Sequence, residues 1–201
     1  MTRARSLAVV SFTLVVGVTG VGCATGAAAP PARQGSAHAP SAPPPTESNP
    51  PGDIPDNQAY VTFQGNGFTV RVPEGWARGT QGADTVYTDK LNTVRITETT
   101  AAAAPTVASV GKEVVPRLRG QVPKFAAAEV SQVSRKGGQA VRLTYRGDSA
   151  TDPVTGKVVR DAFERYAFHR AGREVDLTLS GPVGADNVDP WRIVTDSFTW
   201  R

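Results

Sequence analysis

The chain has 201 residues, enough for one ordinary domain with extensions, and 39% of them are hydrophobic, which is low for a chain that folds along its whole length. Its formal charge of +4, from 22 basic and 18 acidic residues, is spread along the chain and does not form the clustered basic face of a nucleic-acid-binding protein. The single cysteine, Cys23, excludes an internal disulfide and a cysteine-based zinc site. We therefore expect no nucleic acid, metal or cofactor as a partner.

The first 22 residues have the pattern of a secretory signal peptide. Arg3 and Arg5 give a positive start, and an uncharged, mainly apolar stretch from Leu7 to Val21 follows. This stretch is shorter than the roughly 20 residues with which a helix spans a bilayer. The pattern predicts export of the chain.

The residues Gly20-Val21-Gly22-Cys23 resemble a bacterial lipobox, in which a small residue precedes the cysteine that receives lipid and becomes the mature N-terminus. Gly20 departs from the Leu, Val or Ile that is usual in that pattern. The alternative is an ordinary signal peptide cut at a site such as Ala27-Ala28-Ala29. Since the only cysteine directly follows the apolar stretch, the sequence favours anchoring to the extracytoplasmic side of the cell membrane by lipid on Cys23, each buried methylene contributing about 0.8 kcal/mol.

Residues 23–57 form a segment rich in proline and alanine. Residues 24–56 hold nine prolines and no aromatic residue. Such a segment cannot bury enough apolar area to offset its chain entropy, and its prolines favour extended backbone. We therefore predict a disordered tether over 23–57 and a folded domain over 58–201.

From residue 58 the pattern becomes that of short strands, with apolar residues at alternate positions. Four strands are strongly indicated, with apolar positions at Phe68, Val70 and Val72; at Val94 and Ile96; at Val141, Leu143 and Tyr145; and at Val175, Leu177 and Leu179. Weaker candidates are Tyr60–Gln64, Thr85–Thr88, Glu129–Arg135 and Val159–Arg170.

Two segments have helical spacing instead. One stripe of valines and a leucine runs from Val107 to Leu118, where Pro116 is expected to bend or split the helix. Near the C-terminus, Asp189 is a candidate N-cap, and Trp191 begins an apolar face that ends at Phe198. The prediction is an α+β domain: an antiparallel sheet of about six to seven strands with one apolar face covered by the helices.

Four segments in series carry a resemblance to a known family: FTVRVPEGW at 68–76, GQAVRLTY at 138–145, GREVDLTLSGP at 172–182 and WRIVTDSF at 191–198. In their order and spacing they resemble the PsbP-like superfamily and, within it, the actinobacterial LpqN-type lipoproteins. The resemblance implies a sandwich of antiparallel sheet and helices. It implies no reaction, and no functional residue is carried over from it.

Catalysis is not expected. His169 is the only histidine of the predicted domain, and no GxSxG motif is present to place a nucleophilic serine beside it. Acid–base chemistry needs convergent titratable groups, and the sequence shows no recognisable pair of them.

A candidate binding surface comes from four arginines at polar positions of the alternating strands: Arg71, Arg95, Arg142 and Arg146. If their strands were neighbours, these side chains would form a basic stripe on the outer face of the sheet, with Glu98 and Asp176 neutralising part of it. The alternative is a solvated sheet face with cross-strand charge pairs.

Taken together, the sequence favours a non-catalytic binding or accessory domain held at the membrane, whose partner is an envelope protein, a wall polymer or a lipid. The alternative is a carrier of an apolar, lipid-like ligand, which predicts a large apolar pocket.

Overall fold

The computed structural model describes residues 51–151 and 156–201. The predictions for the signal peptide, for Cys23 and for the tether up to residue 50 lie outside the described residues. Among the described residues, no helix is both long and apolar enough to cross a membrane.

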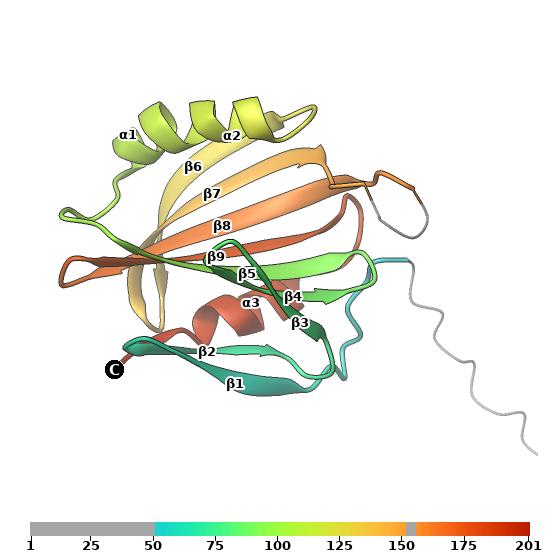
Figure 1. The fold of residues 1–201 in the computed structure, drawn as a ribbon, viewed down its shortest axis with the longest axis horizontal. Helices are drawn as coiled ribbons and strands as arrows, with labels where there is room; N and C mark the ends of the chain where they lie inside the picture. Colours follow the sequence, from blue (N-terminus) through green and yellow to red (C-terminus); the bar gives the residue numbers. More distant parts are fainter. Residues whose placement is uncertain (1–50, 152–155) are drawn as a thin grey trace, which may run out of the picture. The chain divides into compact units, whose positions relative to one another are not determined.

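The described chain forms two antiparallel sheets and two helical segments (Figure 1). The smaller sheet has the strand order β1-β2-β10, with bounds Tyr60–Gly65, Phe68–Pro73 and Thr199–Trp200. The larger sheet has the order β3-β4-β5-β9-β8-β7-β6, with bounds Ala77–Gln81, Asp84–Asp89, Asn92–Thr100, Arg173–Pro182, Arg160–Arg170, Gly138–Asp148 and Ala126–Arg135. The predicted α+β fold with an antiparallel sheet of about seven strands is confirmed.

The main core lies between the larger sheet and a layer made of the smaller sheet and helix α3 (Val188–Asp196). Figure 1 shows α3 and the β1–β2 hairpin together on one side of the larger sheet. Phe198 lies at the centre of this core, its ring stacked on Phe168 at 4.1 Å and on Phe68 at 5.4 Å between centroids. Trp191 is 8% exposed in the same core, as its place on the predicted apolar face implies.

A second, smaller core lies on the opposite face of the same sheet. There α1 (Val107–Ser109), η1 (Val110–Val114) and α2 (Val115–Gln121) cover β7 and β8, with Val110 and Val115 packed on Leu143 and Tyr145. The prediction that one sheet face is apolar and takes both helices is therefore wrong: each helical segment covers its own face, as Figure 1 shows.

The strand register explains why both faces carry apolar residues. Four residues pair in a row across the larger sheet: Leu143, Arg165, Thr178 and Arg95. Their side chains therefore lie on the sheet face that the first helical segment covers. That face is thus apolar over β7 and polar over β5 and β9. Because side chains alternate along a strand, the intervening residues of β5, β8 and β9 supply the main core.

The first helical segment is interrupted just before Pro116. Val110–Val114 form a π-helical turn, and Pro116 follows in the first turn of α2. Proline has no N–H to donate to the preceding turn, so a widened turn ahead of it is a physical consequence of its position. The predicted bend or split at Pro116 is confirmed.

At the C-terminal helix the predicted cap is wrong by two residues. Helix α3 begins at Val188 with Asn187 at the N-cap, so Asp189 lies inside the first turn. The Asn187 side chain makes no capping bond because its amide is engaged elsewhere.

The last residues of the predicted tether are part of the folded domain. Gly52 and Ile54 are buried, and Ile54 belongs to the main core. The Asn187 side chain accepts a hydrogen bond from the Ile54 N–H at 2.8 Å and donates one to the Gly52 carbonyl at 2.9 Å. Asn92 donates a second bond to the same carbonyl, also at 2.9 Å. We call this arrangement the asparagine clamp; it moves the ordered boundary N-terminal to residue 58.

Candidate functional site: a charged cleft beneath the first helix

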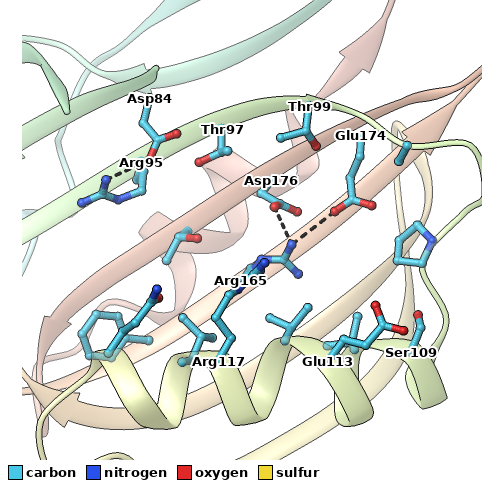
Figure 2. Close-up of a pocket in the computed structure, with 18 of the residues that line it drawn as sticks. Asp84, Arg95, Thr97, Thr99, Ser109, Glu113, Arg117, Arg165, Glu174 and Asp176 are labelled. Atoms are coloured by element: carbon cyan, nitrogen blue, oxygen red, sulfur yellow. Dashed lines mark hydrogen bonds and ion pairs between the residues drawn. The ribbon is translucent and has the colours of Figure 1, made fainter. Parts of the chain in front are cut away.

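A cleft of about 970 Å³ lies between the first helical segment and the polar half of the larger sheet. Figure 2 shows the helix as one wall and the strands as the floor, with charged side chains of both walls facing the space between them. The floor residues that carry polar groups are Asp84, Arg95, Thr97, Thr99, Arg165, Glu174, Asp176 and Thr178, and the helix adds Ser109, Glu113, Arg117 and Gln121. Its volume falls in the range of sites that bind small molecules.

A buried cluster of three charges forms the centre of the floor. Arg165 on β8 is 7% exposed and its Nη2 donates to the Asp176 carboxylate and, at 3.3 Å, to Glu174, both on β9 (Figure 2). Its other terminal nitrogen, Nη1, and Oδ1 of Asp176 are buried without a hydrogen-bond partner in the described part of the chain. Burial raises the pKa of Asp176 above its ordinary value, and the Arg165 guanidinium opposes that rise. Unmet hydrogen-bonding groups of this kind cost stability and often mark sites of function.

The end of the cleft near β4 and β5 is more fully paired. Arg95 Nη1 donates to Asp84 at 2.9 Å, and its Nη2 donates to Gln81 at 2.5 Å. Tyr145 lies beside this end, stacked on Phe163 at 4.6 Å between ring centroids. Burial raises the pKa of Tyr145 to about 12, although Arg165 and Arg95 lower it, so its hydroxyl stays protonated at physiological pH.

The helical wall presents two charges that are not paired with protein. Glu113 and Arg117 are exposed, line the cleft and form no hydrogen bond or ion pair with any residue that the structure describes. Arg117 is near enough to Asp176 to lower the pKa of that carboxyl. The hydroxyls of Thr97, Thr99 and Thr178 likewise have no hydrogen-bond partner within residues 51–151 and 156–201. The cleft therefore offers free donors and free acceptors together.

The four arginines proposed as a binding stripe do not come together. Arg71 lies on β2 of the smaller sheet, 5.4 Å above the Tyr60 ring, and Arg95 lies in the cleft. Arg142 pairs with Tyr166 on the main-core face of β7, and Arg146 lies four residues further along the same face. Arg95 lies on the opposite face of the larger sheet, so the expectation of a single stripe is wrong. The alternation along each strand was predicted correctly, but the order of the strands could not be predicted from the sequence.

The side chain of His169 contacts the backbone of Ala101. Its Nε2 lies 2.8 Å from the Ala101 carbonyl, which accepts a hydrogen bond from the ring at one end of the cleft. No group of three or more His, Cys, Asp or Glu side chains with metal-binding geometry occurs within the described ranges.

Four charged residues of the cleft were not predicted as site residues: Arg165, Glu174, Glu113 and Arg117. The available signal was that Arg165, Glu174 and Asp176 occupy polar positions of strands whose other positions are apolar. These polar positions form a site because β9 pairs between β5 and β8 and the first helical segment lies across them. A local sequence pattern shows neither arrangement.

Comparison with known proteins gives a result at the level of the fold. No protein-family model matches the chain, and no curated protein matches it in sequence. Solved structures are found among its matches. The cyanobacterial PsbP of Synechocystis sp. PCC 6803 has a TM-score of 0.52 at 14% identity, over 72% of this chain and 94% of that one.

A protein from Bacteroides thetaiotaomicron has a TM-score of 0.45 at 12% identity over 70% of this chain and 48% of its own length. LpqN of Mycobacterium tuberculosis, described as involved in cell envelope biogenesis, has a TM-score of 0.40 at 16% identity, over 72% of this chain and 91% of that one. The narrower assignment to LpqN-type lipoproteins remains a prediction. Membership of the PsbP-like superfamily also stays a prediction, and the likeness to the cyanobacterial protein shows that the chain has a PsbP-like fold.

Proposed function

We propose that this protein is a non-catalytic binding or accessory domain of the cell envelope, and that the cleft beneath the first helix is where its ligand binds. The observation that carries the proposal is the combination of a cleft of about 970 Å³ with charged groups of both signs on its two walls. A second cavity among the described residues, beside Trp76 and Asn92, has about 120 Å³ and is much smaller.

The charges of the cleft favour a polar ligand over the apolar cargo of a carrier. An acyl chain laid on the floor would remove Arg165, Glu174 and Asp176 from the remaining water without offering them a hydrogen bond. Desolvating charged groups in this way costs several kcal/mol per ion. Apolar side chains, among them Pro105, Val110, Tyr145 and Phe163, also line the cleft, so an acyl chain in it would still contact the charged floor.

The location of the domain follows from the N-terminal pattern. A signal peptide over 1–22, lipid on Cys23 and a proline-rich segment after it would hold the domain at the extracytoplasmic side of the membrane. A tethered domain with an open polar cleft is suited to capturing envelope components or partners rather than transforming them.

The test is to close the cleft and measure binding. The full chain is purified in detergent and screened by thermal shift and calorimetry against a chemically diverse set of polar and lipid-like compounds. Thr97 lines the floor and its side chain has no hydrogen bond with described residues, so Thr97→Trp should fill the cleft at little cost in stability. Thr62→Trp, on the exposed outer face of β1, is the matched control.

The expected result is at least one polar ligand that binds the wild type and the Thr62→Trp control but not the Thr97→Trp variant. Ligands that bind all three proteins equally would place the site elsewhere and overturn the proposal. Lipid-like compounds as the only cleft-dependent binders would replace it with the carrier function.

A further inference from the structure

We propose that the ligand of the cleft is a short peptide with both ends free, held as a zwitterion with its ammonium group beside Glu113 and Glu174 and its carboxylate beside Arg117. This inference rests on the proposed function, because it names the ligand class of the same cleft. It is carried by the two unpaired charges on the helix and by their position over the charged floor.

Glu113 and Arg117 are opposite charges on the first helical segment. Four residues apart on one helix, a glutamate and an arginine in this order can pair with each other and stabilise the helix slightly. Here both side chains line the cleft instead, and no ion pair links them to each other or to any described residue. Two opposite charges that face the same cavity unpaired are available to a ligand that carries both signs.

The charged side chains follow an order along the cleft. Figure 2 shows Glu113 on the side of the helix where Glu174 and Ser109 lie, and Arg117 further along the helix, beneath Arg165. Glu174 has one oxygen on Arg165 at 3.3 Å and adds negative charge at the Glu113 end. Arg95 is already bonded to Asp84 and Gln81, whereas Arg117 has no hydrogen bond or ion pair with residues 51–151 or 156–201. We call the side of Glu113 and Glu174 the acidic pole of the cleft and the side of Arg117 its basic pole.

The spacing of Glu113 and Arg117 along the helix limits the length of the ligand. Glu113 lies in the π-helical turn and Arg117 in α2, about one helical turn apart, and four residues of a regular α-helix rise about 6 Å. Two residues of extended peptide span roughly 7 Å, so the termini of a dipeptide match the separation of Glu113 and Arg117, whereas a single amino acid is too short. The threonines between the poles supply hydroxyls that can meet the peptide N–H and carbonyl groups. The volume of about 970 Å³ leaves room for side chains or a longer peptide.

The experiment titrates the purified full chain by calorimetry with three probes: L-alanyl-L-alanine, its N-acetyl derivative and its C-terminal amide. The acetyl group removes the positive charge and the amide removes the negative charge. The wild type should bind the free dipeptide at least ~10-fold more tightly than either blocked form, which corresponds to about 1.4 kcal/mol for each lost charge contact.

Two helix variants then assign the poles. Glu113→Gln should weaken the free dipeptide and the amide, which share the ammonium group, and leave the N-acetyl form unchanged. Arg117→Met should weaken the free dipeptide and the N-acetyl form and leave the amide unchanged. Both residues are exposed and unpaired, so the variants should keep the wild-type melting temperature. Glu129→Gln and Lys112→Met, exposed and outside the cleft, are the matched controls.

Equal binding of all three probes, or binding that neither helix variant changes, would overturn the zwitterion inference. If the dipeptide fails to bind while another polar ligand is lost in Thr97→Trp, the cleft remains the binding site and only the ligand class is wrong. If neither the dipeptide nor any compound of the wider screen binds in the cleft, the proposed function fails as well.

Discussion

The environment of Asp161 disfavours the ionised form of its carboxyl group. It is 5% exposed on β8, and its Oδ1 is buried without a hydrogen-bond partner within the described residues. Burial, with a smaller contribution from Asp148, raises its pKa to about 6. The neighbouring Asp148 shows the opposite case: hydrogen bonds from Lys124 and Arg160, and the charges of both, lower its pKa. Two carboxylates at one end of the sheet should therefore contribute to stability with opposite signs.

The prediction for Asp161 concerns the pH dependence of stability. Between pH 4 and 6 the folded protein holds a proton that the unfolded chain releases, so this residue makes the protein less stable as pH rises through that window, with no further change above it. Asp161→Asn should remove that loss. At pH 7 it should raise the free energy of unfolding by about 1–2 kcal/mol, a value reduced from the full shift to allow for solvent screening.

Chemical denaturation at pH 4 and pH 7 measures this effect. Asp148→Asn is the comparison, and it should lower stability at neutral pH, with the effect fading once the pH falls below the depressed pKa of Asp148. A variant at residue 161 that is no more stable than wild type at pH 7 would show that the carboxylate is solvated better than its burial implies.

Helix α3 is the element that fixes the main core. Trp191 contacts this core together with Val194, and Phe198 follows where the helix ends. We expect Trp191→Ala to cost about 3–5 kcal/mol, because it removes a large buried side chain and leaves a cavity. Val188→Ala on the same helix, at a position 73% exposed, should cost little. Thermal and urea unfolding of both variants measure the difference, and equal stabilities would mean that Trp191 is not packed as described.

The asparagine clamp makes a separate element-level prediction. Asn187→Ala leaves the buried Ile54 N–H without its acceptor, at about 1–3 kcal/mol, and leaves the Gly52 carbonyl with only its bond from Asn92. Residues 51–56 should then be cut more readily by proteases than in wild type. Asn57→Ala, exposed and outside the clamp, is the control. Unchanged cleavage in Asn187→Ala would indicate that Ile54 alone holds this segment.

The elements also show how far a sequence can predict a fold of this kind. Alternation in β2, β5, β7 and β9 gave their positions, and the helical stripe gave the first helix with its interruption. Strand β3, with sequence ARGTQ and every residue exposed, has no apolar alternation and was missed. Strand β10 is two residues long and too short for any period. The candidate site depended on strand order, which local patterns do not encode.

For the whole molecule, the main prediction concerns its place in the cell. If Cys23 is lipidated, the wild-type chain should fractionate with membrane and begin at Cys23, and Cys23→Ala should release the domain or leave an uncut precursor. Fractionation and N-terminal mass spectrometry of the two proteins test this. Identical fractionation with the same N-terminus would favour the ordinary signal-peptide alternative.

The larger sheet has a consequence for the order in which the molecule folds. Its central pair joins β5 to β9, with Thr93 opposite Ser180 and Thr100 opposite Arg173, so the intervening strands and the first helix all belong to the loop that this pairing closes. Non-local pairing of this kind slows folding, because the entropy of loop closure is lost before the contacts form. Strands β6–β7–β8–β9 form one meander of sequence neighbours and β3–β4–β5 form another, and the β5–β9 pairing joins the two groups. The floor of the cleft is built from both groups, so it is complete only once β5 and β9 have paired.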